Sequence, residues 1–288
     1  MNGSDEGDAS RVWLVTGASG GLGRCLVEQV LGEGERVVAA TRRPSRLSDL
    51  AERFPGRMLP VEVDVTDPGQ IQAVVDRTVH RWGRIDVVVS NAGSGLIGGL
   101  EECSRDQIGR SIAVNLMGPI DLMRAALPVM RRLKAGHIIM VGAAAAISNY
   151  PGFSVYGGAK AAVEFVAESL RAEVSHLGIR VSVVQPGPLR TPFLTESLEV
   201  ADSGVQDYVS TVGRFRSLLG RMDGRQPGDP VRAAEAILTL SREPHPPFRL
   251  VLGRYALEKS RKTLAARTAE LEAREAAALS VDFVRPTA

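Results

Sequence analysis

The chain has 288 residues, of which 44% are hydrophobic and 24% are charged, and its formal net charge is +2. A chain of this length and composition can bury the core of one globular domain, and it is not typical of disordered or fibrous proteins. Its basic and acidic residues are interleaved, so no basic surface is indicated for nucleic acid or for a membrane. We therefore expect neither of these as a partner.

Two further observations concern the compartment and metals. The first ten residues are polar and acidic, unlike a signal peptide, and the longest apolar run, 138–147, is shorter than the roughly 20 residues of a membrane span. The two cysteines, Cys25 and Cys103, are too few for a metal cluster and are typical of reduced thiols. We expect a cytoplasmic protein without a metal site.

Short β-branched runs alternate with longer amphipathic stretches along the chain. This alternation predicts strands at 12–16, 36–41, 58–63, 85–90, 137–142, 179–185 and 249–252. It predicts helices at 21–31, 45–53, 67–81, 105–133, 154–176, 231–241 and 255–278. The order indicates the α/β class, as a single doubly wound, Rossmann-like parallel sheet of about seven strands with helices on both faces.

The same pattern suggests a division of the chain. We expect a disordered head at 1–10, a Rossmann-type domain at 11–253 and a helical C-terminal extension at 254–288. Within the domain, residues from 188 to about 230 have weak periodicity and contain Pro, Gly and Ser. A long insertion of this kind is usually a binding loop or lid, so we expect it to close over a substrate.

The first strand runs into the glycine-rich sequence TGASGGLG at 16–23, within which a helix begins. Glycines allow a tight turn and a close approach of the backbone to a pyrophosphate, whose charge then meets free amides at the helix N-terminus. The motif predicts a dinucleotide site. The residues expected to bind are Gly17, Ser19, Gly21, Leu22 and Gly23.

The end of the second strand indicates which coenzyme binds. NAD-binding proteins of this architecture usually place an acidic residue there to hold the ribose 2′-hydroxyl. This chain instead has Arg42 and Arg43 at that place. Guanidinium groups can bind a 2′-phosphate through bidentate, charge-assisted hydrogen bonds, so we expect NADP(H).

Further motifs follow in order. Asn91-Ala92-Gly93 ends the fourth strand, Asn115 lies in the long helix, Tyr156 and Lys160 are four residues apart, and Pro186-Gly187 precedes Thr191. Together with the glycine motif, these residues resemble the short-chain dehydrogenase/reductase family over nearly the whole chain. The tail from 246 to 272 resembles a bacterial reductase branch of that family, known mostly as predicted oxidoreductases.

The resemblance implies roles for further residues. Asp64 and Val65 would lie at the adenine, and Asn91, Ala92 and Gly93 would line the coenzyme cleft. Pro186, Gly187 and Thr191 would flank the nicotinamide. Lys160 would hold the nicotinamide ribose, and Asn115 would position a water that links Lys160 to solvent.

Tyr156 and Lys160 share one face of the predicted helix, because they are one turn apart. A nearby ammonium favours phenolate, so we expect Lys160 to lower the pKa of Tyr156. Tyr156 would then exchange a proton with a carbonyl or alcohol oxygen while the coenzyme delivers or accepts hydride.

One position departs from the family pattern. The family has a serine thirteen residues before the tyrosine, and Ala143 stands there. Alanine cannot donate a hydrogen bond to the substrate oxygen, and loss of such a donor costs on the order of 10²–10³ in rate in other enzymes. Three explanations stay open: a deliberate Ser→Ala substitution, replacement by another donor such as Ser148 or Asn149, or a non-catalytic relative that binds NADP(H).

The sequence therefore predicts an NADP(H)-dependent oxidoreductase acting on a small carbonyl or alcohol substrate, impaired by Ala143. The alternatives are an epimerase or dehydratase of the same family with bound coenzyme, and a coenzyme-binding regulatory protein. By resemblance to the family, we expect a homodimer or homotetramer formed through the helices near 111–133 and 154–176.

Overall fold

The computed structural model describes residues 10–283. Nearly all of the predicted head, and the end of the predicted extension, therefore lie outside the described residues. Within 10–283, seven parallel strands form one sheet in the order β3-β2-β1-β4-β6-β7-β9. They are β1 (Val12–Thr16), β2 (Arg36–Thr41), β3 (Met58–Glu62), β4 (Val87–Ser90), β6 (Gly136–Val141), β7 (Ile179–Pro186) and β9 (Arg249–Leu252). The predicted doubly wound sheet is confirmed, and its strand order reverses between β1 and β4.

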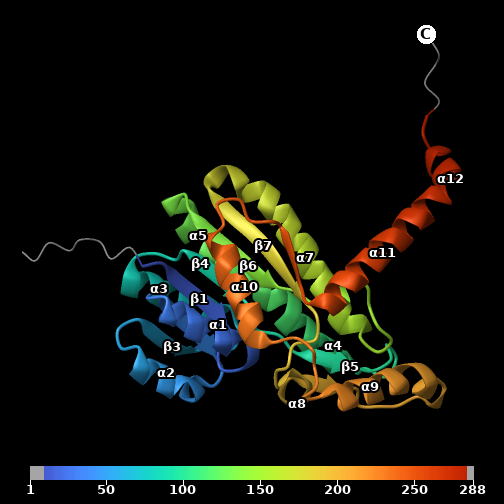
Figure 1. Ribbon diagram of the computed structural model, residues 1–288, viewed down its shortest axis with the longest axis horizontal. Coiled ribbons are helices and arrows are strands. Elements are labelled where there is room, and N and C mark those ends of the chain that lie inside the picture. Colours follow the sequence, from blue (N-terminus) through green and yellow to red (C-terminus); the bar gives the residue numbers. More distant parts are fainter. Residues whose placement is uncertain (1–9, 284–288) are drawn as a thin grey trace, which may run out of the picture.

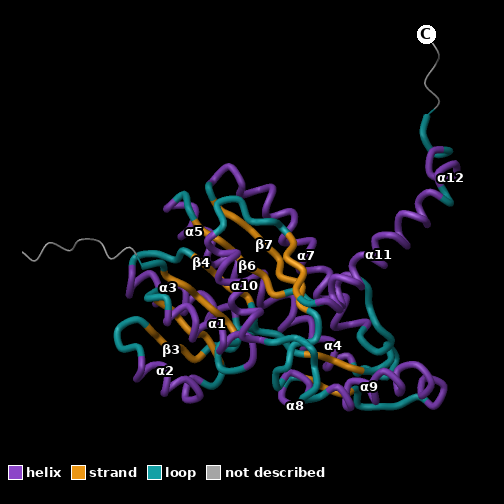
Figure 2. The backbone as a smooth tube through the Cα atoms, viewed as in Figure 1, coloured by secondary structure: helices purple, strands orange, loops and turns teal. Residues whose placement is uncertain are grey.

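Helices cover both faces of this sheet (Figures 1 and 2). One face packs against α1 (Gly21–Gly32), α2 (Ser48–Arg53) and α10 (Pro230–Arg242). The other packs against α3 (Pro68–Trp82), α5 (Gly118–Leu133) and α7 (Ser154–Val174). The central strands are apolar on both sides because both of their faces are buried, as every residue of β1 is.

The predicted long helix at 105–133 is correct in extent but is not uniform. It consists of α4 (Arg105–Ile112), a π-helical turn at Ala113–Met117 and α5. Arg105–Leu133 is also the one described stretch that is long and apolar enough to cross a membrane. Its buried residues, among them Leu122, Met123 and Met130, pack in the core against the sheet, as in a core helix.

Several short elements were not predicted. A second, two-stranded sheet pairs β5 (Gly95–Ile97) with β8 (Leu198–Val200). The others are α6 (Ala144–Ile147), α8 (Phe193–Glu196), α9 (Arg214–Met222), the 3₁₀ turn Gln206–Tyr208 and a π turn at Val209–Gly213. The 3₁₀ turns Pro44–Leu47 and Ser175–Leu177 overlap the predicted helices 45–53 and 154–176. The insertion at 188–230 is therefore more ordered than its weak periodicity indicated.

The insertion leaves and rejoins the domain at one point. Leu189 and Gly228 form an isolated parallel bridge. Arg190 N donates to Gly228 O at 2.8 Å, and Gly228 N donates to Pro188 O at 3.0 Å. After β9 the chain continues into α11 (Arg254–Glu272) and α12 (Glu275–Leu279), which extend away from the sheet (Figure 1).

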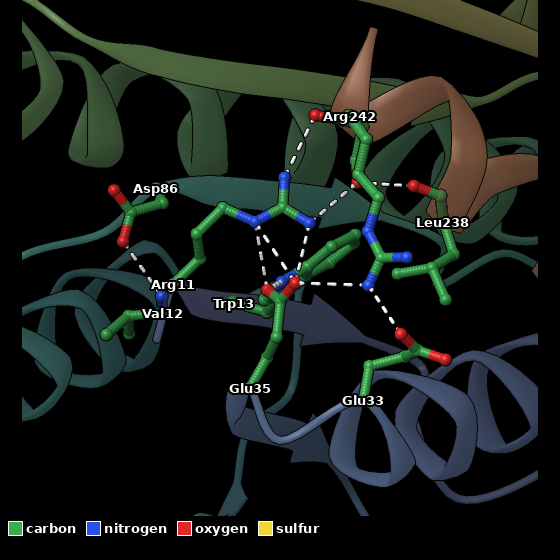
Figure 3. Close-up of polar contacts among 9 residues, drawn as sticks. Arg11, Val12, Trp13, Glu33, Glu35, Asp86, Leu238 and Arg242 are labelled. Carbon is green, nitrogen blue, oxygen red and sulfur yellow. Dashed lines mark hydrogen bonds and ion pairs between the residues drawn. The ribbon is translucent and has the colours of Figure 1, made fainter. Parts of the chain in front are cut away.

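A polar network joins elements at the amino end of the sheet (Figure 3). Glu35 accepts hydrogen bonds from Arg11 Nη2 at 2.8 Å and from Trp13 Nε1 at 2.5 Å. Arg11 Nη1 also donates to Ser241 O at 2.9 Å, and Arg242 lies 2.9 Å from Glu33. These contacts connect β1, the turn before β2 and the end of α10. The functional residues predicted above lie at the opposite, carboxyl edge.

Candidate active site

The glycine loop between β1 and α1 is shaped by close backbone contacts. Gly17 has φ +65°, and a Cβ there would lie 2.9 Å from Ala92 Cα. A Cβ on Gly23 would lie 2.3 Å from Gly17 O, too close for any side chain. Gly21 lies against Thr191, the threonine predicted near the nicotinamide. The loop therefore tolerates only glycine at positions 17 and 23. Because these residues have no side chain, a ligand can approach the backbone of the loop closely.

The first turn of α1 fits a phosphate group. In the described chain no side chain caps this helix at Gly20, and its first turn contains no acidic residue. The first amides of a helix have no intrahelical acceptor and carry the positive end of the helix dipole. The predicted residues Gly21, Leu22 and Gly23 form this turn, so a pyrophosphate would meet unpaired N–H donors.

Hydrogen bonds hold the ends of β1 and β4 together beside the loop. Asn91 Nδ2 donates to Thr16 O at 2.9 Å. The amides of Asn91 and Ala92 donate to Thr16 Oγ1 at 3.0 and 3.1 Å. The predicted cleft residues Asn91 and Ala92 thus fix the shape of the cleft through their contacts with β1.

The predicted 2′-phosphate side lies at the end of β2. Thr41 Oγ1 donates to Ser19 Oγ at 2.8 Å, which places Ser19 beside the residues that follow β2. Arg42 is exposed. Arg43 Nη1 lies 3.2 Å from Glu196 Oε2, and Arg46 Nη1 lies 2.7 Å from the same oxygen. The predicted phosphate ligand Arg43 therefore has a carboxylate partner that is 153 residues away in the sequence.

Asp64 and Val65, predicted at the adenine, follow β3. Asp64 Oδ1 accepts hydrogen bonds from Thr66 N at 2.9 Å and Thr66 Oγ1 at 2.8 Å. These bonds, helped by the charge of Arg42, lower the pKa of Asp64. Val65 O lies against Gly118, at 2.6 Å from where a Cβ on that glycine would stand.

Two of the predicted catalytic residues, Lys160 and Asn115, meet at Gly93 after the end of β4, and Tyr156 lies one helical turn before Lys160. Tyr156 and Lys160 lie on α7 and are buried, and Asn115 lies fully buried in the π turn. A Cβ on Gly93 would stand 3.2 Å from Asn115 Oδ1 and 3.3 Å from Lys160 Nζ, so both groups face this glycine. Asn115 Nδ2 donates to Ser94 O at 2.8 Å. Residues from three elements thus converge on one point, and π turns are frequent at such sites.

Burial is the cause of the pKa shifts of Lys160 and Tyr156. It lowers the pKa of Lys160 to about 8 and raises the pKa of Tyr156. Lys160 Nζ donates to Val141 O at 3.0 Å. We expected the ammonium to lower the pKa of Tyr156, and the structure shows the opposite direction, because loss of hydration penalises the phenolate. Tyr156 is therefore a protonated phenol at neutral pH.

Ala143 lies two residues after the end of β6, with an extended backbone, and immediately precedes α6. It packs in the same apolar cluster as Tyr156. Of the possible replacement donors, Asn149 is engaged within its own loop: its Nδ2 donates to Phe153 O at 3.1 Å and its Oδ1 accepts from Tyr150 N at 2.9 Å. Asn149 is therefore poorly placed to substitute for a serine hydroxyl.

Aromatic rings pack around Tyr156, and the sequence analysis did not identify them. The ring centroid of Phe153 lies 5.2 Å from that of Tyr156, and Phe193 lies 6.0 Å away on the other element, α8. Tyr150 stacks on Phe215 at 5.0 Å. Lys259 Nζ, from α11, lies 3.3 Å from the Tyr150 ring centroid. Tyr150, Phe153, Phe193 and Phe215 thus form an aromatic wall beside Tyr156.

Pro186, Gly187 and Thr191 complete the carboxyl edge at β7. Pro186 is the last residue of that strand, and Gly187 N donates to Leu252 O at 2.9 Å. Thr191 follows and lies over Gly21, as described above. The structure therefore brings all the predicted nicotinamide residues to the edge that carries the glycine loop.

Comparison with known proteins agrees with this arrangement. The model of the family described as short chain dehydrogenase matches residues 11–201. The chain belongs to this family. The oxidoreductase BOA17 of Botryotinia fuckeliana is 35% identical over 254 residues, covering 88% of this chain and 92% of the relative.

Solved structures of short-chain dehydrogenases also match. One from Streptomyces avermitilis is 35% identical, with a TM-score of 0.90, and covers 96% of this chain and 100% of that chain. A closed form of serine dehydrogenase complexed with NADP⁺ is 26% identical, with a TM-score of 0.71, over 84% of this chain and 94% of that chain. This protein is thus an oxidoreductase of the short-chain dehydrogenase family, and a nicotinamide coenzyme fits its glycine loop and uncapped α1 turn.

Proposed function

We propose that this short-chain dehydrogenase is an NADP(H)-dependent oxidoreductase that acts on a carbonyl group or a secondary alcohol. The observation that carries the proposal is the convergence of Lys160 and Asn115 at Gly93, with the buried Tyr156 one helical turn before Lys160, on the sheet edge that also carries the glycine loop. A proton donor beside a dinucleotide site is what carbonyl reduction requires.

The bound coenzyme would supply or accept hydride at its nicotinamide. Tyr156 holds its proton at neutral pH, because burial raises its pKa, and would donate it to the carbonyl oxygen during reduction. Lys160 would hold the ribose beside Tyr156, and its buried ammonium would restore the proton. Asn115 would position the water that supplies Lys160 with this proton. Its side chain is held in place by hydrogen bonds to Ser94 O and Ser111 O.

NADP(H) is favoured over NAD(H) by charge. No acidic residue lies at the end of β2, where Arg42 and Arg43 stand. The related serine dehydrogenase structure contains NADP⁺. Arg42→Asp should shift binding from NADPH towards NADH, because a carboxylate repels the 2′-phosphate and can hold a ribose hydroxyl. Titration of nicotinamide fluorescence measures both affinities, and unchanged selectivity would refute the coenzyme assignment.

Ala143 is proposed to stand at the family's serine position, which would weaken turnover. Ala143→Ser should raise carbonyl reduction by on the order of 10²–10³, because it restores a hydrogen-bond donor to the substrate oxygen. The assay uses a panel of apolar aldehydes and ketones with NADPH. Binding of NADPH without turnover in either form would instead favour a coenzyme-binding regulatory protein, the second candidate that Ala143 supports.

The aromatic wall indicates the substrate class. Phe153 and Phe193 flank Tyr156, and Tyr150 and Phe215 continue the apolar surface along the insertion. Aromatic surfaces bind flat, apolar molecules through burial and ring contacts. We therefore propose a small to medium hydrophobic ketone or alcohol, with the insertion at 188–230 closing over it.

A second copy of the chain is proposed as a partner. Phe165 on α7 is 69% exposed, and Leu133, the last residue of α5, is 39% exposed. Apolar side chains exposed on these two helices fit a homodimer or homotetramer formed through α5 and α7. Phe165→Glu should lower the oligomeric state in sedimentation experiments.

We also propose a cytoplasmic location, since Cys25 and Cys103 are free thiols.

A further inference from the structure

The short helix α8 links the catalytic tyrosine to the arginines after β2. At its start, Phe193 packs against Tyr156, with 6.0 Å between the ring centroids. At its end, the Glu196 carboxylate contacts Arg43 and Arg46 at 3.2 and 2.7 Å. The two contacts are three residues apart in one short helix, so a movement of the α8 backbone at Glu196 would also move Phe193.

Glu196 supplies the carboxylate for a strongly basic corner of the molecule. Arg24, Arg42, Arg43 and Arg46 lie on α1 or after β2. Arg24 pairs with Asp49, and among the described residues Glu196 is the carboxylate within ion-pair distance of Arg43 and Arg46. These two arginines thus hold an anion that comes from the substrate insertion.

The 2′-phosphate of NADP(H) would bring a second anion to the same guanidinium groups. We propose that Glu196 is a coenzyme-specificity residue, whose carboxylate occupies Arg43 and Arg46 until a 2′-phosphate replaces it and releases α8 beside Tyr156. NAD(H) lacks this phosphate, so it would bind without releasing α8. This inference rests on the proposed NADP(H) function and adds that coenzyme choice is coupled to the position of the substrate insertion.

The size of the effect follows from exposure. The Glu196 side chain is 42% exposed, and those of Arg43 and Arg46 are 52% and 45% exposed. Exposed ion pairs are weak, so removal of the competing carboxylate should tighten NADPH binding by only about three- to tenfold. NADH binding should change less than about twofold, because no phosphate competes there.

The first experiment compares two neighbouring carboxylates. Glu196→Gln removes the charge from Arg43 and Arg46, and Glu199→Gln removes a charge of the same segment that pairs with Arg110 instead. Dissociation constants for NADPH and NADH are measured by nicotinamide fluorescence. The proposal requires tighter NADPH binding in Glu196→Gln alone. An equal change for both coenzymes, or the same change in Glu199→Gln, overturns it.

Hydrogen exchange tests the release of α8 without catalysis. Ser197 N donates to Phe193 O at 3.1 Å, and Ala201 N donates to Ile97 O at 2.8 Å, so both amides report on this segment. Adenosine 2′,5′-bisphosphate should speed their exchange, and adenosine 5′-monophosphate should not. Equal exchange with both probes contradicts the release. A wild-type chain that binds neither coenzyme refutes the proposed function itself, whereas tight NADPH binding without these differences refutes only the role of Glu196.

Discussion

Lys160 is a buried cation, and burial of its charge costs stability that its proposed role in the site would justify. Burial lowers its pKa from 10.5 to about 8, so at pH 7 the folded protein carries a charge that water would solvate better. A shift of this size corresponds to about 3 kcal/mol. The hydrogen bond to Val141 O offsets part of that cost. Such trade-offs between stability and function are common at active sites.

We therefore expect Lys160→Met to raise the free energy of unfolding at pH 7 by about 1–2 kcal/mol while abolishing reduction. The wild type should become more stable as the pH rises from about 8 towards 10.5, since the unfolded chain binds the proton more tightly in that range. Urea unfolding at several pH values measures the free energies of unfolding of the variant and of the wild type, and the NADPH assay measures reduction. A less stable Lys160→Met would show that the ammonium is well compensated in the fold.

Burial of His137 makes the free energy of unfolding depend on pH below about 6.5. It is fully buried in β6, and burial, with Arg180 and Arg11 nearby, lowers its pKa to about 3. Its Nε2 lies 3.0 Å from Ser182 Oγ, whose hydroxyl donates to Pro247 O, so Nε2 carries the proton. Below pH 6.5 the unfolded chain takes up a proton that the folded chain refuses.

The protein should lose about 1.4 kcal/mol of stability per pH unit from this histidine as the pH falls from 6.5 towards 3. His137→Leu should remove that part of the slope, and His245→Leu, which changes an exposed histidine, should not. Chemical unfolding at several pH values measures the slopes. Identical slopes in the wild type and His137→Leu would show that other groups cause the acid sensitivity.

The sequence predicted which residues would converge, because each belongs to a local motif with fixed spacing. It could not predict the direction of the Tyr156 pKa, since burial depends on Phe153, Phe193 and the insertion. It could not predict that Arg43 is paired either, because Glu196 lies 153 residues away and no local pattern connects them.

Helix α7 shows how two adjacent glycines differ. A Cβ on Gly157 would lie 2.3 Å from Asn149 Oδ1, whereas one on Gly158 would meet nothing within 4 Å. Asn149 cannot move freely, because it holds Tyr150 and Phe153 in the loop before the helix. The position of Tyr150 and Phe153 in the aromatic wall therefore depends on the absence of a side chain at Gly157.

Gly158→Ala should stabilise the protein by about 0.5–1 kcal/mol, since alanine is the better helix former. Gly157→Ala should destabilise it by about 1–2 kcal/mol and lower turnover, because Asn149 must be displaced. Thermal unfolding and the NADPH assay on the Ala143→Ser background compare the pair. Equal behaviour of the two variants would contradict the packing argument.

At the scale of elements, long runs were predicted well and short ones were not. The strands of the main sheet are buried on both faces, so their β-branched runs stand out. By contrast, β5 and β8 have three residues each, and their pairing joins segments about a hundred residues apart. The π turn at Asn115 has no signal of its own, because the helical pattern continues through it.

The two edges of the sheet carry different tasks. The amino edge holds the network of Glu35, Arg11 and Trp13 (Figure 3). The carboxyl edge holds the candidate active site. We expect Glu35→Gln to cost about 1–3 kcal/mol of stability, because a buried charged hydrogen-bond acceptor is lost, without changing NADPH affinity at 25 °C.

Glu33→Gln is the matched control, since Glu33 is 50% exposed and should cost less than about 1 kcal/mol. Unfolding curves and coenzyme titrations on both variants separate the two tasks. A weaker NADPH affinity in Glu35→Gln would show that strain passes through the sheet from one edge to the other.

The insertion at 188–230 enters and leaves the domain beside Gly228, where two backbone hydrogen bonds close its base. Because the base is narrow, a change in the length of the insertion need not alter the register of β7 or the position of α10. A segment closed at its base in this way can vary in length between relatives, as long as Thr191 and Glu196 keep their contacts with the glycine loop and with the arginines after β2. The insertion could also be exchanged between family members by joining the new segment at Leu189 and Gly228.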